Sequence, residues 1–180
     1  SILDGVPDTV EVWALADFTG GQLPSPLQGL AKTGRFQGVQ MYGQVTGNTL
    51  TSLSELGLQT VAVRHVADAS FVEQTDEWLD QVSPARPDLI LLDAAATDQL
   101  GGTGQSLNWQ LIADRRQAGC FDDWPPLVLA GGLTSKNVAN AIRLVRPAWV
   151  DVASGVEQRP GTKDPAKVRA FLEAAKSVEL

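Results

Sequence analysis

Hydrophobic and polar positions follow one repeating unit along the chain: a short apolar segment, a polar or glycine-containing loop, and an amphipathic segment. The apolar segments are short and uniformly rich in Val, Leu and Ile, which is typical of parallel strands covered on both faces. We expect six strands, at Val10–Ala16, Gly38–Tyr42, Thr60–His65, Leu89–Asp93, Leu127–Ala130 and Trp149–Val152. Strict alternation of strands with helices predicts an α/β fold with a parallel sheet.

The segments between the strands repeat their apolar residues at helical spacing, which predicts helices with one buried face. The three clearest stripes are Phe71, Thr75, Trp78, Leu79 and Val82; Val138, Ala141, Ile142 and Val145; and Val168, Phe171, Leu172 and Ala175. Asp164 followed by Pro165 supplies an N-cap and a first-turn proline for the last helix. We interpret all three stripes as core faces.

Six units in 180 residues give 30 residues per unit, close to the spacing of an eight-unit TIM (β/α)8 barrel of roughly 250 residues. Two architectures remain open at this point: an open doubly wound sheet, and a barrel with two units fewer. The first strand is not followed by a GxGxxG turn, which weakens a dinucleotide-binding interpretation. Because no linker interrupts the pattern, we expect residues 1–180 to form a single domain.

Composition and charge exclude several classes of binding partner. The net charge of −7 argues against a nucleic-acid partner, which requires a basic patch. The single cysteine, Cys120, excludes an intramolecular disulfide and fits a reducing compartment. No apolar run approaches the roughly 18 residues of a membrane span, and no signal peptide opens the sequence. We therefore expect a cytoplasmic protein with no membrane partner.

Glycine turns follow each of the last three predicted strands, at Gly101–Gly104, Ala130–Leu133 and Ala153–Val156. Glycine permits positive φ and close approach of a ligand, so that consecutive N–H groups converge on an anion. In barrels, the loops after the last two strands often form such a phosphate site. The sequence favours phosphate binding over plain turns, with candidate residues Gly102, Thr103, Gly104, Gly131, Gly132, Ser154 and Gly155.

Several ordered motifs make the pattern more specific. They are Leu91-Leu92-Asp93, Gly101–Gly104, Leu129–Leu133, Asn137-Val138, Val150–Glu157 and Pro160–Asp164, with Val39–Gly43 upstream. This series resembles the phosphoribosylanthranilate isomerase family of tryptophan biosynthesis, which is built on an eight-unit barrel. The similarity is strong from Leu89 to Phe171 and fainter from Val10 to Val66. Because it matches the third to eighth units, the resemblance implies a barrel with six of eight units present and the N-terminal two missing.

The resemblance implies an Amadori rearrangement of N-(5-phosphoribosyl)anthranilate to 1-(2-carboxyphenylamino)-1-deoxyribulose 5-phosphate, with no metal or organic cofactor. A general acid must protonate the ribose ring oxygen, and a base must then remove the C2 proton. The resemblance places the acid at Asp93, whose apolar neighbours favour the protonated form. It places Gln40 and Asp151 among the substrate-binding residues. Tyr42 stands where the family usually has His, which puts the fit of the substrate in question.

The base is the point at which the sequence departs from the family. The family uses a cysteine in a CGIT-like motif on the first strand, and an arginine after the second strand helps to hold the anthranilate carboxylate. This sequence has neither motif, and Cys120, between a helix and a strand, is best interpreted as structural or incidental. We therefore expect little or no activity from this chain, because loss of the base lowers the rate on the order of 10²–10⁴-fold.

Other interpretations stay open. One is a non-catalytic phosphate-binding remnant of the same barrel; another, indole-3-glycerol-phosphate synthase, requires a strand-end lysine that we do not find. The expected partner is a homodimer mate or a fused tryptophan-pathway enzyme. Asp17 favours a turn with Phe18–Gly21, and His65 favours a place on the rim over a role as base. Asp151, expected within the last strand, is either a wall of the site or a buried carboxylate satisfied by its neighbours.

Overall fold

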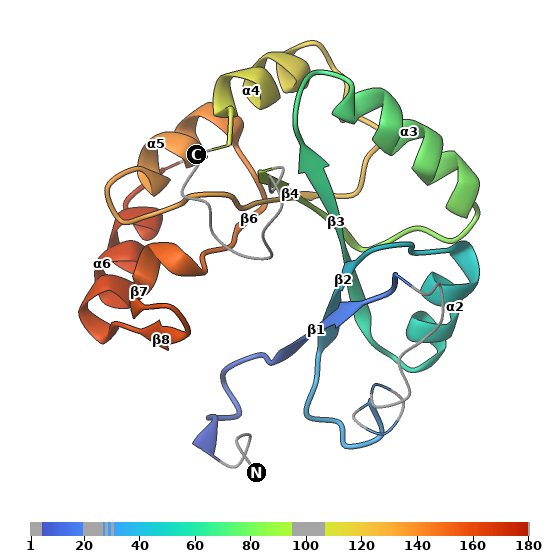
Figure 1. Cartoon of the computed structure of the whole chain (residues 1–180), viewed down its shortest axis with the longest axis horizontal. Helices are drawn as coiled ribbons and strands as arrows, with labels where there is room; N and C mark the ends of the chain where they lie inside the picture. Colours follow the sequence, from blue (N-terminus) through green and yellow to red (C-terminus); the bar gives the residue numbers. More distant parts are fainter. Residues whose placement is uncertain (1–4, 20–26, 28, 30, 95–106, 180) are drawn as a thin grey trace. The chain divides into compact units, whose positions relative to one another are not determined.

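The computed structural model describes residues 5–19, 27, 29, 31–94 and 107–179, and its elements are drawn in Figure 1. The sheet strands are β1 (Trp13–Asp17), β2 (Gly38–Tyr42), β3 (Gln59–Val66), β4 (Leu89–Ala94), β5 (Leu127–Leu129) and β6 (Trp149–Val150). They neighbour one another in chain order, and the β1–β2, β2–β3 and β5–β6 pairs are parallel. The helices are α2 (Gly47–Glu55), α3 (Phe71–Val82), α4 (Trp109–Gln117), α5 (Val138–Val145) and α6 (Pro165–Lys176). A 3-10 turn, η2 (Ser154–Val156), precedes an antiparallel hairpin of β7 (Glu157–Arg159) and β8 (Thr162–Lys163).

All six predicted strands are present, and only the start of β1 and the end of β6 differ from the predicted bounds by more than one residue. β1 begins at Trp13 because the N–H of Val10 is bonded in a turn to Pro7 O, at 3.0 Å, and that of Val12 to the Gln37 side chain, at 2.7 Å. β6 ends at Val150, so the prediction that Asp151 lies within this strand was wrong. Asp151 follows the strand because the chain turns towards η2 there, although its N–H still donates to Leu129 O at 2.9 Å.

Contacts between residues divide the chain into two compact units. The first unit comprises Ser1–Val63 and Gln74–Ile90, and the second comprises Arg64–Glu73 and Leu91–Leu180. Strands β3 and β4 contribute residues to both units, because the division falls within them.

The core of the first unit forms around β2 and α2, with buried Phe18, Val39, Met41, Leu50, Leu53 and Val82. Thr46 caps α2, since its hydroxyl accepts the N–H of Thr49 at 3.2 Å. The backbone of Gly47 passes so close to α3 that a Cβ would lie 2.7 Å from Val82 O. The Trp78 indole N–H donates to Val45 O at 3.0 Å, which ties α3 to the loop before α2.

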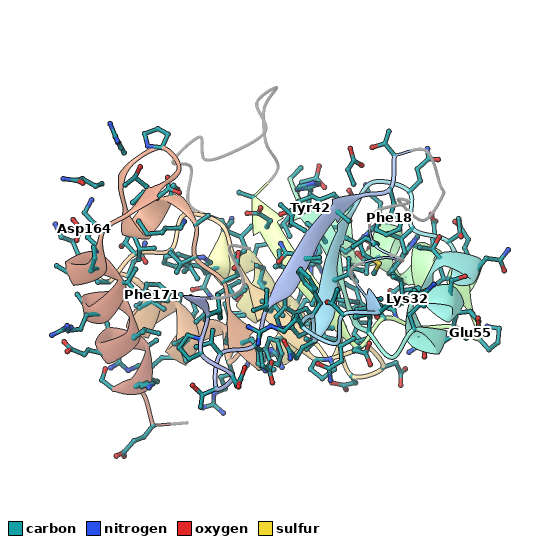
Figure 2. All side chains as sticks on the ribbon, turned by 90° about the horizontal axis from the view of Figure 1, so that it is seen from below. Phe18, Lys32, Tyr42, Glu55, Asp164 and Phe171 are labelled. Atoms are coloured by element: carbon teal, nitrogen blue, oxygen red, sulfur yellow. The ribbon has the colours of Figure 1, made fainter. Side chains whose placement is uncertain are left out.

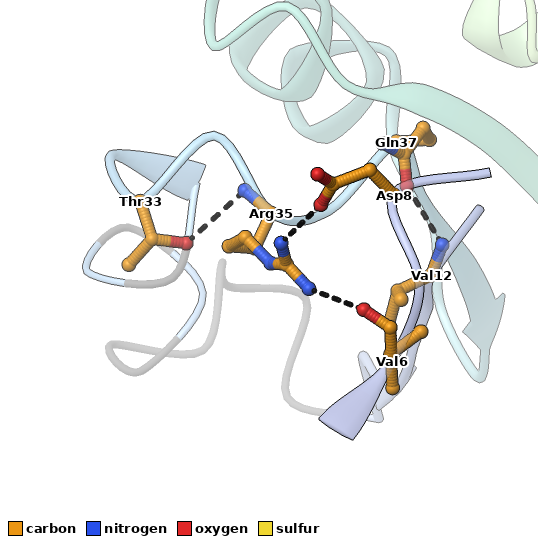
Figure 3. A network of polar contacts seen from close by, with 6 residues as sticks. All are labelled: Val6, Asp8, Val12, Thr33, Arg35 and Gln37. Atoms are coloured by element: carbon orange, nitrogen blue, oxygen red, sulfur yellow. Dashed lines mark hydrogen bonds and ion pairs between the residues drawn. The ribbon is translucent and has the colours of Figure 1, made fainter. Parts of the chain in front are cut away.

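A polar network ties the segments that precede β1 and β2 (Figure 3). The Arg35 guanidinium donates to Asp8 Oδ1 at 2.8 Å and to Val6 O at 3.2 Å. The Asp8 side chain is 92% exposed, so this ion pair contributes little to stability. These contacts anchor the amino ends of the strands.

The second unit is built around an aromatic cluster and the buried faces of its helices. The ring centroid of Phe71 lies 6.0 Å from that of Phe121 and 6.3 Å from that of Trp124, and the Phe121 and Trp124 centroids are 4.7 Å apart. The predicted α5 stripe is buried at all four positions. The α6 stripe is only partly a core face: Phe171 is buried (Figure 2), but Leu172, one residue further around the helix, is 49% exposed.

Two large apolar side chains lie exposed on the strands at the two ends of the sheet order. Leu15 on β1 is 70% exposed and Trp149 on β6 is 45% exposed. Within the part of the chain that the structure describes, no helix is long and apolar enough to cross a membrane.

Candidate active site

The carboxyl ends of β4, β5 and β6 bring three predicted site segments to one edge of the second unit. The backbone hydrogen bond from Ala130 N to Leu92 O, at 3.0 Å, aligns the ends of β4 and β5. The bond from Asp151 N to Leu129 O aligns the end of β6 with β5. Because parallel strands present their carboxyl ends at the same edge, Asp93, the Gly131 turn and Asp151 lie on that edge.

Asp93 is half-buried at the end of β4 and is covered by backbone. Its Oδ1 accepts the N–H of Ala94 at 2.8 Å. Gly131, with φ +78°, passes directly over this carboxylate, and a Cβ there would lie 3.2 Å from Asp93 Oδ1 and 3.0 Å from Ala94 N. Glycine at position 131 therefore allows both the left-handed backbone and the close approach.

Asn137 fixes the conformation of the Gly131-Gly132 turn through its side chain, a role that the sequence did not predict. Gly132 also has positive φ, at +70°. The Asn137 side chain donates to Gly132 O at 3.0 Å and accepts the N–H of Thr134 at 2.7 Å. Asn137 stands at the N-cap position of α5 but makes no side-chain cap bond, because its polar atoms hold the turn instead. The turn thus leads directly into the N-terminus of α5, which favours anions.

The turn after β6 packs on the turn after β5, backbone against backbone. A Cβ at Gly155 would lie only 1.8 Å from Leu133 O and 2.9 Å from Leu133 C. Ser154, the first residue of η2, is exposed, whereas Gly155 is half-buried. The two turns therefore form one continuous backbone surface. The third predicted turn, with Gly102, Thr103 and Gly104, lies outside the described residues.

Asp151 is a carboxyl group of the second unit with a raised pKa. Its pKa is raised above the ordinary value of 3.8, first by burial and then by the negative charge of Asp93. The positive charge of Lys163 and a hydrogen bond from the Val152 N–H oppose this rise. Asp151 thus has features of both interpretations that the sequence left open, because it faces Asp93 and also has compensating neighbours.

Lys163 reaches this edge from β8. Its Nζ donates to Ala153 O at 2.8 Å and to Glu157 Oε1 at 2.9 Å. The bond to Lys163 is the main reason that the pKa of Glu157 is lowered. In the sequence, Lys163 is part of the Pro160–Asp164 motif, and this motif does not predict these contacts.

The remaining candidates of the first unit lie on β1 and β2. Gln40 Nε2 donates to the Tyr42 hydroxyl at 3.1 Å; both side chains are half-buried and share one face of β2. Asp17 is exposed, and its Oδ1 accepts the N–H of Thr19, at 2.8 Å, and the Thr19 hydroxyl. These bonds lower the pKa of Asp17 and are those of the turn that the sequence favoured.

Two further residues were considered from the sequence. His65 is exposed on β3. Cys120 lies in the turn that follows α4 and precedes β5, where its N–H donates to Arg115 O at 3.1 Å. The glycine turns follow the strands, so Cys120 lies at the opposite end of β5 from the Gly131 turn. Among the described residues, no three His, Cys, Asp or Glu side chains are grouped to hold a metal.

Comparisons of sequence assign this architecture to a family. The profile of the N-(5'-phosphoribosyl)anthranilate (PRA) isomerase family matches residues 30–174. The N-(5'-phosphoribosyl)anthranilate isomerase of Crocosphaera subtropica is 31% identical over 98% of this chain and 79% of its own length. That of Trichlorobacter lovleyi is 36% identical over 86% of this chain and 68% of its own.

Solved structures agree with the sequences. Phosphoribosyl anthranilate isomerase from Thermotoga maritima matches with a TM-score of 0.78 and 28% identity, over 98% of this chain and 78% of that one. A phosphoribosyl anthranilate isomerase in complex with reduced 1-(o-carboxyphenylamino)-1-deoxyribulose 5-phosphate matches with a TM-score of 0.74 and 26% identity, over 98% and 77%. The predicted TIM-barrel type of α/β fold is thereby confirmed. This chain belongs to the phosphoribosylanthranilate isomerase family.

Proposed function

We propose that the protein is an N-(5'-phosphoribosyl)anthranilate isomerase of tryptophan biosynthesis, an intramolecular oxidoreductase that converts an aldose derivative into a ketose. The observation that carries this proposal is the half-buried Asp93 carboxylate beneath the Gly131 turn, in a chain of that family. The Gly155 turn packs against Leu133, next to the Gly131 turn. The arrangement provides an acid next to a set of anion-binding N–H groups, which is what a phosphorylated sugar undergoing ring opening requires.

The two packed turns are proposed to hold the phosphate. Backbone N–H groups of Gly131, Gly132, Ser154 and Gly155 act as donors, and the N-terminus of α5 adds a favourable dipole. By resemblance to the family, Gly102, Thr103 and Gly104, which lie outside the described residues, are also proposed to bind the phosphate. Neutral backbone donors explain how a chain of net charge −7 accepts a dianion.

Asp93 is proposed as the general acid. Its Oδ1 accepts the N–H of Ala94, and we assign the transferable proton to its Oδ2. Transfer of this proton to the ribose ring oxygen breaks the bond between that oxygen and C1, and leaves a hydroxyl on C4 and a protonated imine at C1. A base then removes the C2 proton, and the enolamine rearranges to the ketone, so that no electrons leave the substrate. Asp151 and Gln40 are proposed to bind the substrate.

The base defines the second candidate function. Cys120, the only cysteine, lies in the α4–β5 turn and not after a strand, and the family's cysteine motif does not occur in this sequence. Without a base, the rate falls on the order of 10²–10⁴-fold. A phosphate-binding protein that isomerises slowly or not at all is therefore the alternative that this observation favours.

One experiment separates the two functions. We would measure binding of the reduced carboxyphenylamino-deoxyribulose 5-phosphate by calorimetry and isomerisation by loss of anthranilate-derivative fluorescence, for the unaltered chain, Asp93→Asn and a control, Asp114→Asn, on the exposed surface of α4. We expect all three to bind the analogue, and only Asp93→Asn to lose the residual turnover. Binding without turnover in the unaltered chain indicates the phosphate-binding protein. Absence of binding contradicts both functions, and turnover that survives in Asp93→Asn contradicts the acid.

The surroundings of the enzyme are part of the proposal. The single cysteine fits a reducing compartment, so we infer that the protein works in the cytoplasm. We infer that its partner is a second copy or a fused tryptophan-pathway enzyme, since a phosphoribosylanthranilate isomerase from Thermotoga maritima is described as dimeric. Sedimentation velocity of the purified chain tests the first of these partners.

A further inference from the structure

The β7–β8 hairpin returns the chain to the turn that it has just left. Glu157 on β7 pairs with Lys163 on β8, and Gly161, with φ +76°, forms the tight connection. The next residue, Asp164, bonds through its N–H to Val156 O at 2.8 Å and caps α6 with its side chain (Figure 2). The backbone of Lys163 is thus fixed on both sides, by the hairpin and by the helix start.

Because the Lys163 backbone is fixed, the Lys163 ammonium reaches the Ala153 carbonyl and donates a hydrogen bond to it. The Nζ–O distance is 2.8 Å, and Ala153 directly precedes η2. In a trans peptide the C=O and the following N–H lie in one plane and point in opposite directions. A cation that holds the Ala153 carbonyl on one side of the peptide therefore directs the N–H of Ser154 to the other side.

The ion pair with Glu157 orients the Lys163 ammonium and contributes little to the stability of the fold. The Lys163 side chain is 50% exposed and that of Glu157 is 17% exposed, and exposed pairs of this kind contribute little to stability. The carboxylate instead favours the lysine rotamer that makes the charge-assisted bond to Ala153 O.

We propose that Lys163 is a positioning residue of the isomerase, which orients the Ser154 N–H towards the substrate phosphate by holding the Ala153 carbonyl. This inference rests on the proposed function for the identity of the anion. It assigns a task to the hairpin, which otherwise appears only as a connection between β6 and α6.

A second consequence concerns Asp151. The groups that act on this carboxyl are Asp93 from β4, Lys163 from β8 and the N–H of Val152. Lys163 is the only cation among them, and it favours the ionised carboxylate. Removal of its charge should therefore move the titration of Asp151 to higher pH, a change that removal of Lys167, which is not among these groups, should not produce.

Lys167 offers a matched control. Its Nζ also donates to a backbone carbonyl, Glu157 O, at 2.7 Å, and its side chain is exposed, but it does not touch Ala153. We would compare Lys163→Met, Lys163→Arg and Lys167→Met by calorimetry with reduced carboxyphenylamino-deoxyribulose 5-phosphate. We expect about tenfold weaker binding for Lys163→Met, partial recovery for Lys163→Arg and no change for Lys167→Met. Equal losses in the two methionine variants would overturn the proposal.

A measurement without ligand separates this inference from the proposed function. Amide exchange of Ser154 and Gly155 and the carbon-13 titration of the Asp151 carboxyl are followed by NMR in the same variants. We expect faster exchange and a higher Asp151 pKa in Lys163→Met only. If the unaltered chain binds no analogue but these shifts occur, the proposed function fails, whereas the hold of Lys163 on the Ala153–Ser154 peptide stands. If neither shift occurs, the positioning role fails whatever the ligand.

Discussion

The contact between the two glycine turns predicts that Gly155→Ala is among the most damaging small substitutions in the chain. The added Cβ would lie 1.8 Å from Leu133 O, whereas ordinary contact begins near 3.4 Å, so the turns must separate by about 1.6 Å. Both partners are backbone, and no side-chain rotation relieves the clash. Overpacking of cores costs 1–3 kcal/mol and occasionally more, and we expect about 3 kcal/mol here. A displacement above 1 Å should also weaken analogue binding by about 100-fold.

Gly161→Ala is the control for this prediction. Gly161 lies in the same unit and has φ +76°, but no atom lies within 4 Å of the site of its Cβ. Its cost should therefore be that of a left-handed alanine alone, about 1–2 kcal/mol. Urea unfolding followed by tryptophan fluorescence measures the stability of both variants, and calorimetry measures binding. If Gly155→Ala costs no more than Gly161→Ala and binds the analogue normally, the turns do not pack as described.

Three further predictions concern stability. Burial and Asp93 raise the pKa of Asp151 above 3.8, so the folded state binds the Asp151 proton more tightly than the unfolded chain does. Stability therefore falls as pH rises from 3.8, the pKa of the unfolded chain, through the higher pKa of the folded state. Asp151→Asn should therefore be the more stable protein near neutral pH in urea unfolding, with the difference vanishing as pH falls towards 3.8; a constant difference would contradict this. Phe71→Ala, at a ring that is 2% exposed, should cost about 3–5 kcal/mol in the same assay, and a loss below 1 kcal/mol would contradict the aromatic cluster. Asp164→Ala removes hydrogen bonds to Ala166 N and Lys167 N and should cost about 1 kcal/mol, recovered largely by Asp164→Asn.

The strands were predictable because burial on both faces leaves a strong signal in the sequence. Gly38–Tyr42 has the predicted bounds, and the α5 stripe is buried at every position. The ends of β1 and β6 were less predictable, because they depend on single hydrogen bonds, such as that from Val12 N to the Gln37 side chain. Leu172 shows a further limit: helical spacing identifies an apolar stripe but not how far a neighbouring element covers it.

The candidate site was predictable where a strand or a glycine marks it. Asp93 and the glycines after β5 and β6 follow apolar runs directly, so their position at a strand end could be derived from the order of residues. Asn137 and Lys163 could not be assigned roles in this way, because each acts through a carbonyl oxygen, of Gly132 and Ala153 respectively. Every residue carries a carbonyl, and no sequence pattern indicates which one a side chain will reach.

The exposed indole of Trp149 allows β6, the last strand in the order of the sheet, to be followed by fluorescence. Trp124 is buried and Trp149 is 45% exposed, so the two rings sit in apolar and aqueous surroundings, respectively. The other three tryptophans, Trp13, Trp78 and Trp109, are half-buried, so acrylamide should quench Trp149 more readily than the other four. A polypeptide that pairs with β6 would shift the Trp149 part of the emission to the blue. Leu15, on β1 at the other end of the order, has no such signal of its own. A single tryptophan substitution at that position would turn the second edge into an equally readable optical sensor.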